Sequence, residues 1–192
     1  MTKGYTLFDT AIGRCGIAWG EHGVLGVQLP LPKESQTLAR LLQRCEGVEE
    51  MVPPPHIRDV ILGIVAQMNG DARDLTGVVL DTTGVPAFNL KVYEIARTIK
   101  AGKTLSYGDI AKRLGGVELS RDVGQALGQN PYPIIVPCHR VLAAGGKPGG
   151  FSANGGVVTK LKMLAIEGAY VNHTPSLFDF PVNEPRARSG PH

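Results

Sequence analysis

The segment 130–141, which reads NPYPIIVPCHRV, constrains the fold more than any other part of the chain. Its three prolines remove backbone donors and fix φ, so it cannot form a regular helix although most of its residues are apolar. We expect it to follow one rigid, irregular path through the interior and so to fix Cys138 in place. Taken alone, Cys138 is most simply a buried small hydrophobic residue. With His139 and Arg140 beside it, the thiol can instead have a lowered pKa and act as a nucleophile.

Three further segments carry motifs in a fixed order. Residues 88–93 read FNLKVY, residues 102–111 read GKTLSYGDIA and residues 163–168 read MLAIEG. With Pro-Cys-His-Arg-Val at 137–141, they resemble the motifs of the O6-alkylguanine-DNA alkyltransferases, also called methylated-DNA–protein-cysteine methyltransferases, in which the first motif is a Phe-Gln-x-x-Val-Trp box. The match runs over roughly residues 85–169, which is too extensive for coincidence. The N-terminal third of the chain is not diagnostic.

The pattern of apolar residues predicts strands first and helices afterwards. Short apolar runs at 6–10, 16–19 and 24–29 predict an antiparallel meander with a turn at 21–23. Helical spacing predicts helices at 34–45, 56–68, 88–100, 107–114, 121–129 and 159–166. We interpret 71–86 as a short strand and linker, Ser106 and Ser120 as helix caps, and Asn130 as a left-handed helix exit.

The resemblance implies a fold class of α/β plus mainly α. Residues 1–84 would form a small ribonuclease-H-like α/β support domain. Residues 85–170 would form a winged-helix-like domain with a helix-turn-helix, which binds DNA and carries the active site. Residues 171–192, rich in proline and charge, are expected to form a loosely ordered tail.

The resemblance also assigns the chemistry of the site. Cys138 would be the nucleophile that attacks the alkyl carbon on guanine O6. His139 would lie between Cys138 and Glu167, through a water, as in a catalytic triad. Tyr107 would push the target phosphate and help to protonate the purine, and Asn130 would brace the active-site turn. The thioether has no easy exit, so each molecule would react once.

The partner implied by the resemblance is double-stranded DNA that carries alkylated bases, O6-alkylguanine and O4-alkylthymine. The helix expected at 121–129 would enter the minor groove on a face of small residues, while Arg121 fills the space of the flipped base. The expected DNA-binding residues are Arg121, Tyr107, Gly124, Gln125, Ala126 and Gly128. The expected alkylguanine pocket is formed by Val141, Phe151, Ser152 and Pro133. Arg140 and Lys160 are interpreted as structural residues or phosphate contacts.

Composition is compatible with this reading. The net charge of +3 and pI near 8.8 are mildly basic, as a nucleic-acid partner allows but does not require. The chain has no apolar run of about 18 residues and no secretory signal, so we expect a cytoplasmic protein. Its three cysteines are expected to be reduced thiols. Cys15 and His22 have no second pair of ligands at a suitable spacing, and we expect a monomer without metal or cofactor.

Two other functions remain open. An alkyltransferase-like sensor would bind the lesion and flag it for excision repair with little or no transfer, although such proteins replace the cysteine. A cysteine hydrolase would need turnover and an oxyanion site, for which no segment is apparent. Asn89 and Tyr93 replace the commoner Gln and Trp of the family motif, and the loop 150–156 is a variant, which leaves the range of alkyl groups open.

Overall fold

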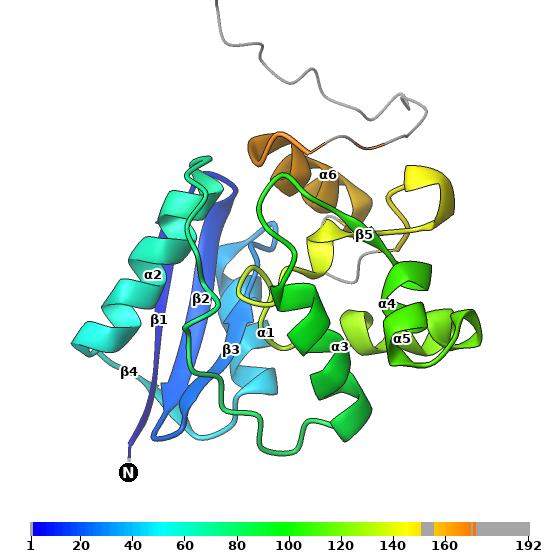
Figure 1. Cartoon of the computed structure of the whole chain (residues 1–192). Coiled ribbons are helices and arrows are strands. Elements are labelled where there is room, and N and C mark those ends of the chain that lie inside the picture. Colours follow the sequence, from blue (N-terminus) through cyan, green and yellow to red (C-terminus); the bar gives the residue numbers. More distant parts are fainter. Residues whose placement is uncertain (1, 151–155, 170, 172–192) are drawn as a thin grey trace, which may run out of the picture.

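The computed structural model describes residues 2–150, 156–169 and 171 (Figure 1). The N-terminal half contains β1 (Lys3–Thr10), β2 (Gly13–Gly20), β3 (Gly23–Gln28), α1 (Glu34–Arg44), β4 (Val48–Glu50) and α2 (Pro55–Met68). The sheet order is β3-β2-β1-β4, with antiparallel β1–β2 and β2–β3 pairs and a parallel β1–β4 pair. The expected meander and both helices are therefore confirmed, whereas β4 was not expected.

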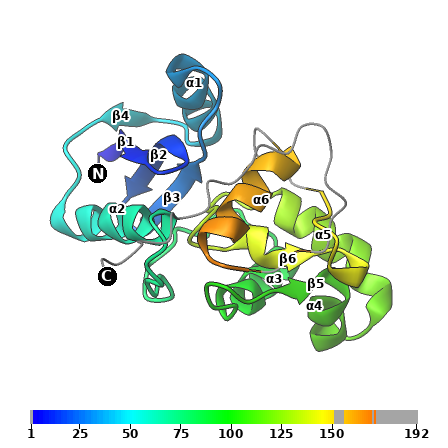
Figure 2. The same ribbon diagram turned by 90° about the horizontal axis from the view of Figure 1, so that it is seen from above.

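The two helices of this half cover opposite faces of the sheet (Figure 2). Alternation along β2 explains how one strand serves both faces, because successive side chains of a strand point to opposite sides. Ile17 belongs to the apolar cluster that includes Ile64 of α2. Its neighbour Ala18 belongs to a second cluster with Leu41 of α1. The N-terminal half is thus a three-layer α/β/α arrangement.

The C-terminal half is mainly helical. It contains α3 (Ala87–Arg97), β5 (Leu105–Ser106), α4 (Tyr107–Leu114), α5 (Ser120–Gly128), β6 (Val141–Leu142) and α6 (Gly156–Ile166). Three short 3-10 helices, η1 (Val117–Leu119), η2 (Cys138–Arg140) and η3 (Ala144–Gly146), lie between them. β5 and β6 form a two-stranded parallel sheet. None of the helices in the described ranges has the length and apolar character needed to cross a membrane.

The start of α4 shows why the chain turns into a helix at that point. Ser106 Oγ accepts a hydrogen bond from the Asp109 backbone N–H at 3.0 Å, and the Asp109 carboxylate accepts one from the Ser106 backbone N–H at 2.8 Å. This capping box satisfies two backbone donors that the helix itself leaves unpaired. The cap predicted at Ser106 is confirmed, and it places Tyr107 as the first residue of α4.

Both expected caps of α5 are wrong, and α3 ends at Arg97 rather than at residue 100. Ser120 does not cap α5, because η1 runs directly into the helix and the chain is already helical at Leu119. The Ser120 hydroxyl instead donates to the Val117 carbonyl at 2.6 Å. Asn130 is not a left-handed exit, since Ile134 is the single non-glycine residue with positive φ in the described part of the chain. The helix ends through Gln129, at φ −94° and ψ 3°.

The segment 71–86 joins the two halves without the strand expected there. Its one sheet contact is an isolated bridge between Val24 and Leu80. Arg97 of α3 holds the segment in place, because its Nη2 donates to the carbonyls of Leu75, Thr76 and Val78, each at 2.9 Å. A charged donor satisfies these carbonyls where no regular secondary structure does.

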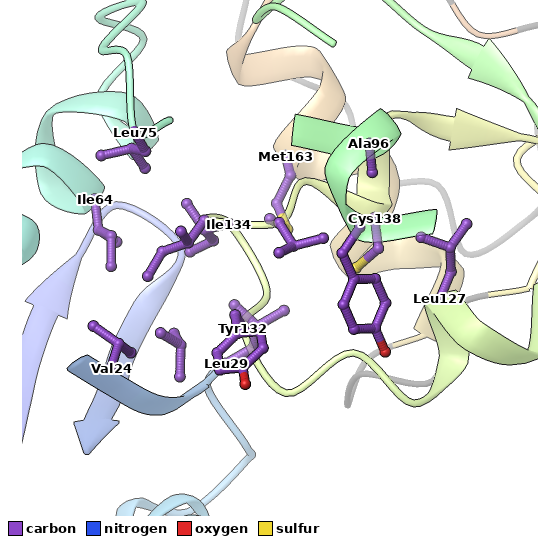
Figure 3. Packing of buried hydrophobic residues seen from close by; sticks show 14 of the residues in the cluster. Val24, Leu29, Ile64, Leu75, Ala96, Leu127, Tyr132, Ile134, Cys138 and Met163 are labelled. Atoms are coloured by element: carbon purple, nitrogen blue, oxygen red, sulfur yellow. The ribbon is translucent and has the colours of Figure 1, made fainter. Parts of the chain in front are cut away.

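One apolar cluster connects the two halves (Figure 3). It passes from Val24 and Ile64 through Tyr132 and Ile134 to Cys138. Each residue from 132 to 142 is buried, so the proline-rich segment runs through the interior on an irregular path, as predicted. The position of Cys138 is therefore fixed by packing from both halves of the molecule.

Candidate active site

Cys138 lies on the wall of a cavity of about 610 Å³, between the first residue of α4 and one face of α5. Cys138 as a whole is 8% exposed to solvent, so its thiol is nearly buried but still borders the cavity. The other residues of the wall are Tyr107, Ser120, Arg121, Gly124, Gln125, Leu127, Gly128 and Gly150. A cavity of this size is in the range that holds a small organic molecule or a base.

Asn130 holds the turn that carries Cys138. Its Nδ2 donates to the Val136 carbonyl at 2.9 Å, and its Oδ1 accepts from the Tyr132 backbone N–H at 2.9 Å. The Cys138 backbone N–H donates to the same Val136 carbonyl at 2.8 Å. Because a proline-rich segment cannot satisfy its own backbone groups in a helix, one buried amide side chain does so here. This geometry agrees with the expected bracing position of Asn130.

His139, Arg140 and Glu167 form one buried network. His139 Nε2 lies 2.9 Å from Glu167 Oε1, and the Glu167 side chain is 1% exposed. Arg140 donates to both carboxylate oxygens, from Nη2 at 2.7 Å and from Nε at 3.0 Å, and its Nη1 donates to the Ile99 carbonyl. A bidentate pair of this kind fixes the carboxylate in direction as well as in distance. The proximity of His139 to Glu167 is as expected, whereas the Arg140 contact was not foreseen.

The protonation states follow from this network. Burial alone raises the pKa of Glu167, but hydrogen bonds from His139 and Arg140, with their charges, outweigh it and bring the pKa to about 2. Burial lowers the pKa of His139, against the opposing effect of Glu167. A neutral imidazole beside a carboxylate carries its proton on Nε2. Nδ1, which has no hydrogen-bond partner among the described residues, is then the acceptor nitrogen.

The Cys138 thiol differs from the expectation. Burial raises its pKa, and the hydrogen bond from Asn130 and the charge of Lys160 only partly oppose this effect. The resting thiol is therefore protonated, and the lowered pKa expected from the sequence is wrong. Proximity in sequence to His139 and Arg140 does not lower the pKa because the imidazole is neutral and the guanidinium is directed at Glu167. A reaction at this sulfur must include removal of its proton.

Lys160, interpreted from the sequence as a structural residue or a phosphate contact, lies beside Tyr107 of the site and interacts with Cys138. The whole Lys160 residue is buried, and its Nζ donates a hydrogen bond to the Val141 carbonyl at 2.6 Å. Nζ also lies 5.8 Å from the centre of the Tyr107 ring, and burial lowers its pKa to about 8. Lys160 lies three and four residues before Met163 and Leu164, which are the other buried residues of α6. This helical spacing was the signal in the sequence that could have placed Lys160 on the buried face.

The exposed face of α5 partly matches the expectation. Arg121 and Gln125 are exposed. Among the described residues, a Cβ built at Gly124 or at Gly128 would meet no atom within 4 Å, so packing within that part of the chain does not require either glycine. Ala126 is buried, and its carbonyl accepts a hydrogen bond from the Tyr93 hydroxyl at 2.7 Å. Ala126 therefore packs inward against α3 and is not part of the exposed small-residue face.

The expected base pocket is only partly described. Phe151 and Ser152 lie outside the described residues. Pro133 and Val141 are buried, and neither belongs to the described wall of the Cys138 cavity. Tyr107 does belong to it, and its hydroxyl donates to the Gly150 carbonyl at 3.3 Å. Within the same described ranges, His, Cys, Asp and Glu side chains form no group of three suited to a metal ion.

Comparison with known proteins identifies the family. Residues 87–169 match the family model for the 6-O-methylguanine DNA methyltransferase DNA-binding domain. A methylated-DNA–protein-cysteine methyltransferase of Methanothermobacter thermautotrophicus is 32% identical over 157 residues, which cover 80% of this chain and 78% of that protein. The chain belongs to the methylated-DNA–protein-cysteine methyltransferases. The resemblance found in the four sequence motifs is thereby confirmed.

Other members of the methyltransferase family agree with this assignment. A Mycobacterium tuberculosis methyltransferase is 42% identical over 120 residues, or 61% of this chain and 71% of that protein. The crystal structure of Mycobacterium tuberculosis O6-methylguanine methyltransferase aligns with a TM-score of 0.69 at 28% identity, over 93% of this chain and all of that one. Mycobacterium tuberculosis OGT in complex with DNA aligns with a TM-score of 0.64 at 30% identity, over 85% of this chain and 92% of that one. The mixed α/β fold is that of these methyltransferases.

Proposed function

We propose that this methyltransferase repairs DNA by moving an alkyl group from guanine O6 to its own Cys138, once per molecule. The observation that carries the proposal is a nearly buried thiol on the wall of a base-sized cavity, beside a buried His139–Glu167 pair. Membership of the family supports the same chemistry. O4-alkylthymine is proposed as a second substrate, because a pyrimidine is smaller than the purine for which the cavity has room.

Proton transfer in the proposed reaction begins at the sulfur. The Cys138 proton passes to His139 Nδ1 through a water, and Glu167 stabilises the imidazolium that results. The thiolate then attacks the alkyl carbon, forming a C–S bond while the C–O bond to guanine breaks. The electron pair stays on the guanine, which takes up one proton from Tyr107 at the cavity wall, and the proton held by His139 then restores the Tyr107 hydroxyl. The product is a thioether at Cys138, a bond that has no easy route to cleavage, so each molecule reacts once.

The proposed DNA interface is the exposed face of α5. We infer that this helix enters the minor groove, where the absence of side chains at Gly124 and Gly128 allows its backbone to approach closely. Arg121 fills the space left by the flipped nucleotide, whose base enters the cavity. Arg121 and Gln125 are both exposed and both belong to the cavity wall, which supports this arrangement.

The proposed division of labour between the two halves follows the same family. Residues 1–84 form a ribonuclease-H-like support domain, and the strand order β3-β2-β1-β4 with a single parallel pair supports this description. Residues 85–170 form the winged-helix-like reactive domain, in which α4 and α5 are the helix-turn-helix. The protein acts on duplex DNA as a monomer.

The proposal is tested by mass spectrometry of the protein after reaction. Incubation with a duplex that contains O6-methylguanine should add one methyl mass to the peptide that carries Cys138, in a stoichiometric amount. Cys138→Ala should bind the damaged duplex and gain no mass. Tight binding of the wild-type protein without any mass gain would instead identify a lesion sensor, and repeated turnover of an ester without DNA would identify a hydrolase.

The role of Arg121 is tested by two substrates. Arg121→Ala should slow the reaction with O6-methylguanine in duplex DNA much more than the reaction with free O6-benzylguanine, which needs no flipping. Lys112→Ala removes a positive charge from α4 and is the control for loss of charge alone. Equal losses with both substrates would contradict the proposed role of Arg121.

A further inference from the structure

The N-terminal half contacts the active-site segment at three polar points. The Val27 backbone N–H donates to the Pro131 carbonyl at 2.9 Å, and the Tyr132 hydroxyl donates to the Asp81 carbonyl. The third contact joins Arg44 Nη2 to the Asn130 carbonyl at 3.0 Å, across 86 residues of sequence. Of these three contacts only the one from Arg44 uses a charged side chain, and only this one reaches the residue that holds the Cys138 turn.

Arg44 is the last residue of α1 and lies at the junction of the two halves. It lines a cavity of about 230 Å³ with Cys45 and Leu41 of its own half and with Gln129 and Pro131, which flank Asn130. As a whole the residue is exposed, yet desolvation around the guanidinium lowers its pKa. The charged group is therefore partly withdrawn from water where it meets the Asn130 carbonyl, and this strengthens the hydrogen bond.

The Asn130 peptide connects Arg44 to the sulfur. Arg44 donates a hydrogen bond to the Asn130 carbonyl. The Asn130 side chain in turn binds the Val136 carbonyl and the Tyr132 N–H. The Val136 carbonyl that this side chain holds also accepts the Cys138 backbone N–H at 2.8 Å, so the Asn130 amide positions the turn that carries the sulfur. The amide also lowers the pKa of Cys138, although burial outweighs this effect. A displacement of the Asn130 peptide would thus move the amide group that supports the nucleophile. His139 and Glu167 do not take part in this connection.

We propose that Arg44 is a positioning residue for the reaction, which fixes the Asn130 peptide and so the amide that supports Cys138. The inference rests on the proposed function only for its DNA substrate, since reactivity of the thiol can be measured without DNA. It gives the support domain a specific part in the chemistry. A helix of the N-terminal half would then adjust a nucleophile that belongs to the C-terminal half.

The charge of Arg44 also favours the reactive form of Cys138. The ionised form of Cys138 raises the pKa of Arg44, so the Arg44 charge must by the same interaction favour the thiolate. Among the described residues, other groups that interact with Cys138 are Asn130, Lys160 of α6, Tyr107 of α4, Tyr93 of α3 and the adjoining His139. Removal of Arg44 leaves all of these in place, so its own contribution can be isolated.

The test compares Arg44→Met and Arg44→Lys with the control Arg40→Met. Arg40 is exposed one turn earlier on the same helix, so its substitution removes an equal charge without touching Asn130. Two rate constants are measured against pH for each protein: the reaction with free O6-benzylguanine, and alkylation of the Cys138 peptide by iodoacetamide. Thermal unfolding is recorded in parallel.

Arg44→Met should slow both reactions by roughly tenfold, the scale of one hydrogen bond from a charged group, and should move their pH profiles to higher pH. Arg44→Lys should keep the pH profile and recover part of the rate, and Arg40→Met should match the wild type. If Arg44→Met unfolds at a lower temperature but reacts at the wild-type rate with an unchanged profile, Arg44 is merely structural and the inference fails. If the wild-type protein reacts with iodoacetamide but not with benzylguanine, the proposed function fails instead.

Discussion

His139 Nε2 and Arg140 Nη2 both lie within hydrogen-bond distance of one atom, Oε1 of Glu167, at 2.9 Å and 2.7 Å. The carboxylate therefore serves two neighbouring residues of the chain. It orients the imidazole, and it compensates a guanidinium that is almost completely buried. Loss of the negative charge should disturb both functions at once.

Glu167→Gln should slow alkyl transfer by about 100-fold, because a neutral amide does not stabilise an imidazolium as a carboxylate does. It should also lower the free energy of unfolding by about 3 kcal/mol, since Arg140 remains buried without its counter-charge. The measurements are single-turnover transfer to O6-methylguanine DNA and chemical denaturation. Glu94→Gln, at an exposed position of α3, is the control and should change neither quantity. A wild-type transfer rate in Glu167→Gln would contradict this role of the carboxylate.

The stability of the protein should fall on the acid side in two steps. The pKa of His139 is lower in the folded than in the unfolded chain, so stability declines as pH falls below about 6.5 and the unfolded state takes up a proton. The pKa of Glu167 falls from 4.5 to about 2, so its contribution, on the order of 3 kcal/mol, is present above about pH 5 and is lost towards pH 2. Denaturation at a series of pH values measures both. Glu167→Gln should lack the second step, and a second step of unchanged size in that variant would assign it to other carboxylates.

Gly124→Ala and Gly128→Ala should separate folding from DNA binding. Each added methyl group meets no atom of the described residues within 4 Å, and alanine favours the helix over glycine by up to about 1 kcal/mol, so neither variant should be less stable than the wild type. Affinity for duplex DNA should nevertheless fall, while the reaction with free O6-benzylguanine is retained. Gly108→Ala, in α4, controls for helix propensity, since its methyl group would lie at an ordinary 3.6 Å from Ser106 Oγ. Unchanged DNA affinity in both α5 variants would place the DNA on another face.

Ile134 is strained and its neighbour is not. Ile134 has a φ of 75°, which costs a β-branched residue about 1–2 kcal/mol, whereas Ile135 has an ordinary φ. Both residues are almost completely buried. Ile134→Gly should therefore destabilise the protein by about 1–2 kcal/mol less than Ile135→Gly, because glycine relieves the strain at position 134 only. Chemical denaturation of the two variants measures the difference, and an equal loss would show that the turn is not strained.

The secondary structure was largely predictable because it depends on local patterns. The alternating strands of the meander, the Ser106 cap and the proline-rich interior segment are each determined by residues close in sequence. The errors arise where residues distant in sequence determine whether a side chain is buried. Ala126 reads as part of an exposed small-residue face until α3 brings the Tyr93 hydroxyl to its carbonyl.

The chemistry of the site shows the same division. The motifs named Cys138, His139 and Glu167, and the structure places the last two within hydrogen-bond distance. The pKa of Cys138 was not predictable, because it depends on how deeply the sulfur is buried.

Arg97 hydrogen-bonds three carbonyls of the segment 75–78, so this connection is held in one conformation although its sequence is typical of a flexible linker. Together with the shared apolar cluster, it ties the two halves to one another. The protein should tumble in solution with a single rotational correlation time. A cut between residues 71 and 86 should release no fragment until the whole chain unfolds.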